Sequence, residues 1–173
     1  MQAIPVSTLF PMVVGLLKEM YEGVPAGQPT WVIDSGPGSG ILAAVRGLTA
    51  AEASTSIDGS GSRGTTIAAH IEHLRWSLVN VNEALRGKEY SSNWSESWNL
   101  IDANPSAWDE LREALRREYE TLRDTLLIMF SSAGSPVELE DDYITGLLAL
   151  IPHAAYHLAA ILQMIERVRE KTA

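Results

Sequence analysis

The chain has four histidines, and they form two pairs at helical spacing. His70 and His73 stand three residues apart, and His153 and His157 stand four apart. Residues at i, i+3 and i+4 lie on one side of a helix, one turn apart, so each pair can direct two imidazoles at one point. Neutral imidazole is a common ligand for zinc, nickel, copper and ferrous iron. Two such helices packed together would therefore surround a site with the nitrogen ligands of a transition metal.

The later pair, in the sequence HAAYH, lies beside the apolar stripe of its predicted helix rather than at its centre. Both histidines fall on the flank that carries Leu150 and Met164, which suits a groove between two helices. Pro152 removes one backbone hydrogen bond just before the pair and is a typical cause of a helix bend. The spacing alone leaves two interpretations open, a metal site or two hydrogen-bonded core histidines.

The earlier pair is harder to divide into one ligand and one core residue. His70 is nearer the centre of its helix's apolar stripe, whereas His73 lies farther round, on the flank that carries Ser77. Periodicity alone favours His70 as the inward-facing ligand, with a satisfied core histidine as the alternative. The stripe itself consists of Ile67, Ile71, Leu74, Leu78, Val81 and Leu85.

The charge and composition of the chain limit its partners. A sequence of 173 residues is most simply one domain, here 1–173, and it is long enough to bury a core. Its 13 basic and 22 acidic residues give a net charge of -9, which opposes binding to nucleic acid or to an anionic membrane. The chain has no cysteine, so a disulfide, a zinc–thiolate site and a cysteine nucleophile are excluded. This composition is typical of a cytoplasmic protein.

One segment is apolar enough to raise the question of a membrane. Residues 144–165 contain no Asp, Glu, Lys or Arg over 22 positions, which is the length of a bilayer span. The same segment contains a proline, two histidines and a glutamine, and it is rich in alanine. We therefore expect a helix that packs among other helices. The first residues lack the basic segment and cleavage site of a signal peptide.

Apolar periodicity and capping signals predict an all-α fold with four long helices and a short one. Thr65 or Thr66 can cap the second long helix, Asn104 the third, and Pro11 falls in the first turn of the first. No strand pattern of useful length occurs. The expected helices span about 7–23, 41–53 (the short one), 67–85, 105–130 and 140–171.

A long connection separates the second and third long helices. Helix bundles usually have short loops, so this length predicts a crossover that lets the two helices run parallel. Trp94 and Trp98 lie within the connection, where they either bury apolar area that pins it to the bundle or line the mouth of a pocket. Trp76 lies opposite the apolar stripe of its helix and, if exposed, would indicate a partner surface.

These features together resemble the DinB/YfiT-like superfamily of metal-binding four-helix bundles. The relevant residues are a Thr-Ile start to the second long helix, His73 six residues after Ile67, and HxxxH at His153 and His157 in the last helix. The order of helices and the long crossover also agree, so the resemblance covers nearly the whole chain. It implies a divalent metal, often zinc or nickel, bound by His73, His153 and His157, with His70 as a fourth ligand or a group behind the ligands.

The resemblance also implies two classes of function. Some relatives use a low-molecular-weight thiol as co-substrate in transferase or isomerase chemistry, and others are regarded as metal-dependent hydrolases. We expect a metal-dependent enzyme acting on a small molecule, or, as the alternative, a non-catalytic bundle that binds a metal or a small ligand. No residue stands out as a general base. We further expect a homodimer, because Trp76 and the uncharged span of the last helix offer more apolar surface than one small bundle covers.

Overall fold

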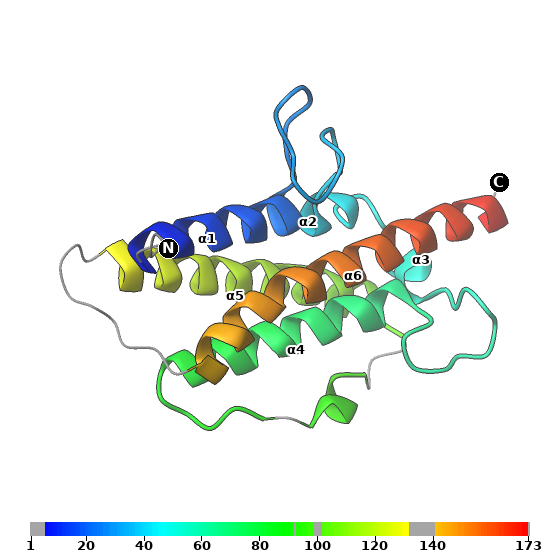
Figure 1. Cartoon of the computed structure of the whole chain (residues 1–173). Helices are drawn as coiled ribbons and strands as arrows, with labels where there is room; N and C mark the ends of the chain where they lie inside the picture. The colour runs from blue at the N-terminus through cyan, green and yellow to red at the C-terminus, as the bar shows by residue number, and fades with distance from the viewer. Residues whose placement is uncertain (1–5, 92, 99–101, 132–140, 173) are drawn as a thin grey trace.

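The computed structural model describes residues 6–91, 93–98, 102–131 and 141–172. Within these ranges every regular element is helical and no strand occurs, which confirms the all-α expectation (Figure 1). The elements are α1 (Val6–Glu22), α2 (Ile41–Ala44), α3 (Ala50–Ser54), α4 (Ile67–Leu85), the 3₁₀ helix η1 (Trp94–Trp98), α5 (Pro105–Ser131) and α6 (Asp141–Thr172).

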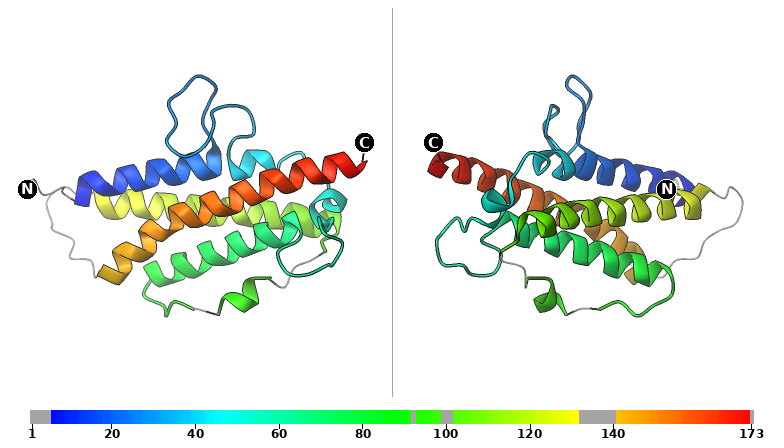
Figure 2. Two further views of the ribbon diagram at one scale, coloured as in Figure 1. Left: turned by 45° about the vertical axis from the view of Figure 1, so that its right-hand side comes forward. Right: turned by 180° about the vertical axis from the view of Figure 1, so that it is seen from behind.

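The four long helices α1, α4, α5 and α6 pack around a common core. Helices α4 and α5 lie side by side, α1 packs against α5 and α6, and α6 also packs against α4. Helices α4 and α5 run in the same direction, opposite to α1 and α6 (Figures 1 and 2). The connection between α4 and α5 therefore returns along the molecule, and η1, which lies within it, packs on α4.

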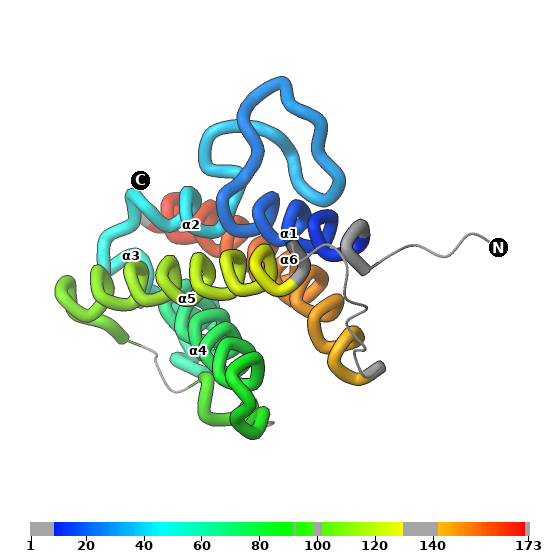
Figure 3. Tube along the Cα trace, turned by 90° about the vertical axis from the view of Figure 1, so that its left-hand side faces the viewer, coloured from blue at the N-terminus to red at the C-terminus, as the bar shows by residue number. Residues whose placement is uncertain are grey.

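The stripe of α4 shows how the sequence builds the core. Ile67, Ile71 and Leu74 are fully buried, and Leu78 is nearly so, as expected from their spacing. The last two members of the stripe, Val81 and Leu85, are only partly buried. The core thus ends before α4 does, at the end of the molecule where the start of α6 lies beside it (Figure 3).

Thr66 and Asn104 form the predicted caps of two helices, and a glycine ends a third. The Thr66 side chain accepts a hydrogen bond from the backbone N–H three residues later at 3.1 Å, and the Asn104 side chain does the same at 2.9 Å. Gly23 follows α1 with φ of 82°, a left-handed conformation that glycine adopts without strain. Thr66, rather than Thr65, is therefore the cap that places the first histidine pair on α4.

Two details of the expected helices are wrong. The segment 41–53 forms two short helices, because Thr49 starts a new one. Its hydroxyl accepts from the N–H of Glu52 at 3.2 Å, and the Glu52 carboxylate accepts from the N–H of Thr49 at 2.7 Å. This reciprocal capping is readable from the sequence TAAE. Pro11 lies in the second turn of α1, since that helix begins at Val6.

Helix α6 meets the length and composition criteria of a membrane-crossing helix, with a mean hydropathy of 1.5 over its most apolar window. One third of that window is buried inside the molecule, against α1 and α4. The helix continues through Pro152 without a break. Its outer face remains apolar and exposed at Leu148, Tyr156 and Leu162.

Candidate metal centre

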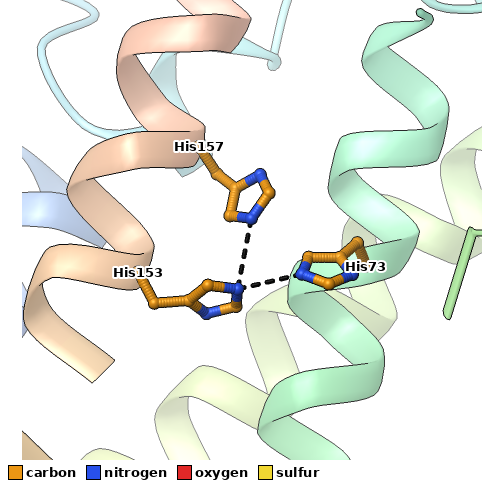
Figure 4. Close-up of side chains that lie close together, drawn as sticks. All are labelled: His73, His153 and His157. Carbon is orange, nitrogen blue, oxygen red and sulfur yellow. Dashed lines mark hydrogen bonds between the residues drawn. The ribbon is translucent and has the colours of Figure 1, made fainter. Parts of the chain in front are cut away.

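Three histidines from two helices meet at one point. His73 lies on α4, and His153 and His157 lie one turn apart on α6 (Figure 4). The Nε2 atom of His153 stands 2.9 Å from Nε2 of His73 and 3.1 Å from Nε2 of His157. One ring nitrogen from each of the three residues lies within 4.8 Å of the other two. The three histidines could therefore hold one metal ion.

Two of the three nitrogen separations are close to those of a tetrahedral metal site. Zinc–nitrogen bonds of 2.0–2.1 Å place two nitrogens of a tetrahedral site about 3.3–3.4 Å apart. The two Nε2 separations are a few tenths of an ångström shorter. An outward movement of the rings by that amount would accommodate the ion. Three imidazoles form a donor set that suits zinc, nickel and copper better than calcium or magnesium.

The hydrogen-bond partner of His73 directs its lone pair into the site. Ser97 is completely buried, and its hydroxyl donates to the carbonyl oxygen of Trp94 at 2.6 Å. Nδ1 of His73 lies 2.7 Å from the same hydroxyl oxygen. A hydroxyl has one hydrogen, so Nδ1 of His73 must be the donor in this second bond. A neutral His73 therefore carries its lone pair on Nε2, toward the other two histidines.

A second chain of hydrogen bonds does the same for His157. Nε2 of His70 lies 3.0 Å from the carbonyl oxygen of Gly64, which can only accept, so this nitrogen carries the hydrogen. The remaining lone pair of neutral His70, on Nδ1, faces Nδ1 of His157 at 2.9 Å. Nδ1 of His157 is then the donor, and its lone pair lies on Nε2. Metal-binding histidines typically have their other nitrogen fixed in this way.

His70 and His73 therefore differ in what they can do. Both are 4 % exposed, so burial does not separate them. Both ring nitrogens of His70 are occupied, by Gly64 and by His157. His73 has one nitrogen free to face the cluster. Periodicity favoured His70 as the inward ligand, but the structure places His73 with the later pair and His70 behind His157.

Burial keeps the four histidines neutral. Desolvation lowers the pKa of His73 to about 4, with smaller contributions from the charges that His153 and His70 would carry. Desolvation also lowers the pKa of His157, to about 2, with its three histidine neighbours adding to the effect. The pKa values of His70 and His153 are lowered by the same burial. At neutral pH, protons therefore compete little with a cation for these nitrogens.

The Nε2 lone pairs of the cluster repel one another, and a bound cation would remove this repulsion. Because His73 and His157 carry their hydrogens on Nδ1, only His153 can place a hydrogen between the three Nε2 atoms. One hydrogen cannot lie between both pairs of nitrogens at the same time. A metal ion would accept all three lone pairs and relieve their mutual repulsion.

The tryptophans of η1 cover this cluster, so both interpretations of them hold in part. Trp98 stacks on His73, with ring centroids 4.1 Å apart and an angle of 19° between the planes. Trp94 contacts the rings of His73 and His153 and also lines a cavity beside them. Trp76 is only partly buried, and it packs against Trp94.

Of three polar residues near the histidines in sequence, Glu72 and Asn82 bond to groups outside the cluster, and Tyr156 contacts it through its ring. Glu72 forms two hydrogen bonds to the guanidinium of Arg75. The side-chain amide of Asn82 donates to Glu118. Tyr156 is 68 % exposed, and its ring lies 5.0 Å from the His157 ring at an angle of 86° between the planes. None of the three offers a carboxylate or imidazole base at the cluster.

Sequence reasoning missed Ser97 and Gly64. Ser97 lies between two tryptophans in NWSESW, and nothing in that spacing indicates a partner for a histidine 24 positions earlier. Gly64 contributes only a backbone carbonyl, which no side-chain pattern reveals. The one general expectation that could have led to them is that a metal-binding histidine donates its other ring N–H to an acceptor.

Comparisons of the chain with family models, with curated proteins and with solved structures found no match.

Proposed function

We propose that the chain binds one divalent transition-metal ion, zinc or nickel, through Nε2 of His73, His153 and His157. The convergence of these three nitrogens carries the proposal. The hydrogen bonds of Ser97 and His70 support it, because they leave the lone pairs of His73 and His157 directed at the same point. A fold of the DinB/YfiT-like kind is part of the proposal, and it is supported by the parallel α4 and α5 and the position of HxxxH on α6.

Three neutral protein ligands are typical of a catalytic rather than a structural site. Structural zinc usually has four protein ligands, whereas catalytic zinc has three and an open position for water or substrate. Such an ion supplies a Lewis acid and lowers the pKa of a bound water or thiol. His153 lines a cavity next to the cluster, so a ligand from solvent has a route to the open position.

We propose a metal-dependent enzyme that acts on a small molecule, as a thiol-dependent transferase or as a hydrolase. The chain has no cysteine, so a sulfur nucleophile must come from a low-molecular-weight thiol. A metal with three neutral ligands keeps its full positive charge and favours the thiolate. The alternative is a bundle that binds metal or ligand without catalysis. It is favoured by the positions of Glu72 and Asn82, which bond to Arg75 and Glu118 and not to the cluster.

Calorimetry with a panel of cellular thiols would test the thiol proposal. Metal-loaded protein should bind a thiol more tightly than stripped protein, and more tightly as pH rises, because the thiolate is the ligand. Equal binding in both forms would exclude the thiol as a metal ligand. If neither form binds a thiol, turnover of simple amides and esters by the loaded protein would support the hydrolase. Its absence would leave the non-catalytic alternative.

We also propose a homodimer formed through the outer face of α6. Trp76 lends this less support than its sequence position suggested, because Trp94 covers part of it. The support comes instead from Leu148, Tyr156 and Leu162 on α6, together with Met12 of α1, which are all exposed. Sedimentation should give a dimer at micromolar concentration, and Tyr156→Arg should shift it to monomer. A wild-type monomer would contradict the proposal.

A further inference from the structure

An apolar cavity of about 540 Å³ borders the histidine cluster at His153. It lies between the second half of α4 and the first half of α6, with Trp94 and Tyr90 from the connection along one side. The residues that line it are Ser77, Val81, Ala84, Leu85, Tyr90, Trp94, Asp142, Tyr143, Gly146, Ala149, Leu150 and His153. His153 is both a member of the histidine cluster and part of the cavity wall.

The cavity is elongated along the two helices. On α6 its wall extends from His153 back to Tyr143, which at 1.5 Å per residue is about 15 Å. On α4 the wall extends from Ser77 to Leu85, which is the same direction in space because α4 and α6 are antiparallel (Figure 1). The histidines therefore lie at one end, and Asp142 and Tyr143 lie at the other.

The polar groups of the wall are few. Ser77 lies one helical turn after His73 and brings a hydroxyl close to the cluster. Most of the remaining wall is aliphatic or aromatic. Asp142 is exposed at the far end, where its carboxylate opposes a second anionic group on a ligand. A pocket of this kind is complementary to one polar head next to the histidines and an uncharged body behind it.

The small residues of the wall leave room for that body. Apart from its chain neighbours and the backbone of its own helix, a methyl group added at Gly146 would meet no atom within 4 Å. Ala84 and Ala149 are also small and line the same cavity. Larger residues at these places would fill it, as Val81 and Leu85 do in part on α4.

We propose that this cavity holds the extended apolar body of a ligand whose single metal-binding head group occupies the open position beside His153. The ligand class is an unbranched aliphatic or arylalkyl thiol or acid with no second anionic group. The inference rests on the proposed metal site and adds the substrate class. The cavity supports it because its apolar wall is continuous with the candidate metal ligands.

Straight-chain alkanehydroxamic acids are suitable probes, because the head group binds the metal and the chain length can be varied. Titration of cobalt-loaded protein, followed by the visible spectrum of the ion, gives the affinity of each homologue. Affinity should rise about fourfold per buried methylene from acetohydroxamate upward. The increase should stop when the chain reaches the open end beside Asp142.

Gly146→Leu tests the cavity without touching a histidine. The variant should keep its metal and its affinity for acetohydroxamate but lose the increase with chain length, so that octanohydroxamate binds at least tenfold more weakly than to wild type. Gly15→Leu is the matched control, since Gly15 is a helical glycine of α1 that also has open space around it. It should behave like wild type. Ala84→Leu is a second variant from the α4 side, for use if Gly146→Leu does not fold.

Metal content measured before each titration separates the two claims. A wild-type protein that holds no metal would contradict the proposed function. A metal-loaded protein whose affinity is independent of chain length would overturn the cavity inference alone. The cavity proposal would also be overturned if Gly146→Leu and Ala84→Leu both left the dependence on chain length intact. It would be overturned as well if another segment or a second copy of the chain filled the cavity and no probe bound.

Discussion

The two histidine pairs reach the same cluster in different ways. On α6, at a spacing of four residues, both His153 and His157 direct Nε2 at the site. On α4, at a spacing of three, only His73 does so, and His70 contacts His157 from behind. Trp98 contacts both rings of the α4 pair, since it stacks on His73 and meets the ring of His70 edge-on.

This difference separates residues that would bind an ion from residues that position them. The α6 pair can supply two ligands, but the tautomer of one of them, His157, is set by a residue of α4. The α4 pair could supply one ligand, His73, and also the hydrogen-bond acceptor, His70, that sets the tautomer of His157 on the other helix. The cluster therefore forms only when α4 and α6 are packed together. An ion that binds it would bind the folded state alone and would raise the free energy of unfolding.

Removing any of the three converging histidines should have the largest effect. His153→Ala, His157→Ala and His73→Ala should each lower metal affinity by more than about 100-fold, beyond the range typical of groups behind the ligands. Metal content of chelator-stripped and reconstituted protein measures this. If His73→Ala keeps its metal and His70→Ala loses it, then His70 is the ligand on α4 and His73 is not.

Acid should destabilise the metal-free protein through both pairs. The unfolded chain takes up protons on its histidines near pH 6.5, whereas burial holds the pKa of His73 at about 4 and lowers the pKa values of the other three. Because the folded state binds fewer protons, its free energy of unfolding should fall by roughly a few kcal/mol as pH decreases from 6.5 to 4.

Urea denaturation in the presence of a chelator, at several pH values in this range, would measure the change. His73→Gln should reduce the dependence on pH, since glutamine does not titrate. A stability that is flat between pH 6.5 and 4 would show that the histidines are solvated and not part of a buried cluster.

His70→Ala should have an intermediate effect that distinguishes positioning from ligation. The variant should still bind one ion, about 10- to 100-fold more weakly, because His157 loses the partner that fixes its tautomer. His70→Gln should recover part of the loss, since an amide can accept from His157 and donate to Gly64. The visible spectrum of bound cobalt should be the same in wild type and both variants. A changed coordination in His70→Gln would make His70 a direct ligand.

Ser97→Ala should have the smallest effect of the series. It removes the acceptor of His73 Nδ1–H but leaves the stacking of Trp98 on the ring in place. We expect about a tenfold loss of metal affinity and a loss of about 1–3 kcal/mol in stability from the unpaired buried N–H. Ser95→Ala, in the same 3₁₀ helix but exposed, is the control and should match wild type.

The sequence predicted most of the framework of this site. Apolar periodicity placed α4 and α6, and the caps at Thr66 and Asn104 were readable because short polar side chains before an apolar run satisfy free backbone N–H groups. Periodicity favoured His70 and could not show that His73 faces the later pair, because both residues are buried and differ only in what lies behind them. The groups behind the two histidines are Ser97 and the carbonyl of Gly64, and both lie in segments without a regular period of apolar residues.

The proposed metal centre binds one ion through three histidines and no other residue of the chain. X-ray absorption at the metal edge of reconstituted wild-type protein tests it most directly, together with the metal-to-protein ratio. We predict one zinc or nickel ion per chain, with three imidazole nitrogens at about 2.0–2.1 Å and one further light atom from solvent. A ratio near zero, or a first shell with fewer than three imidazoles, would contradict the claim.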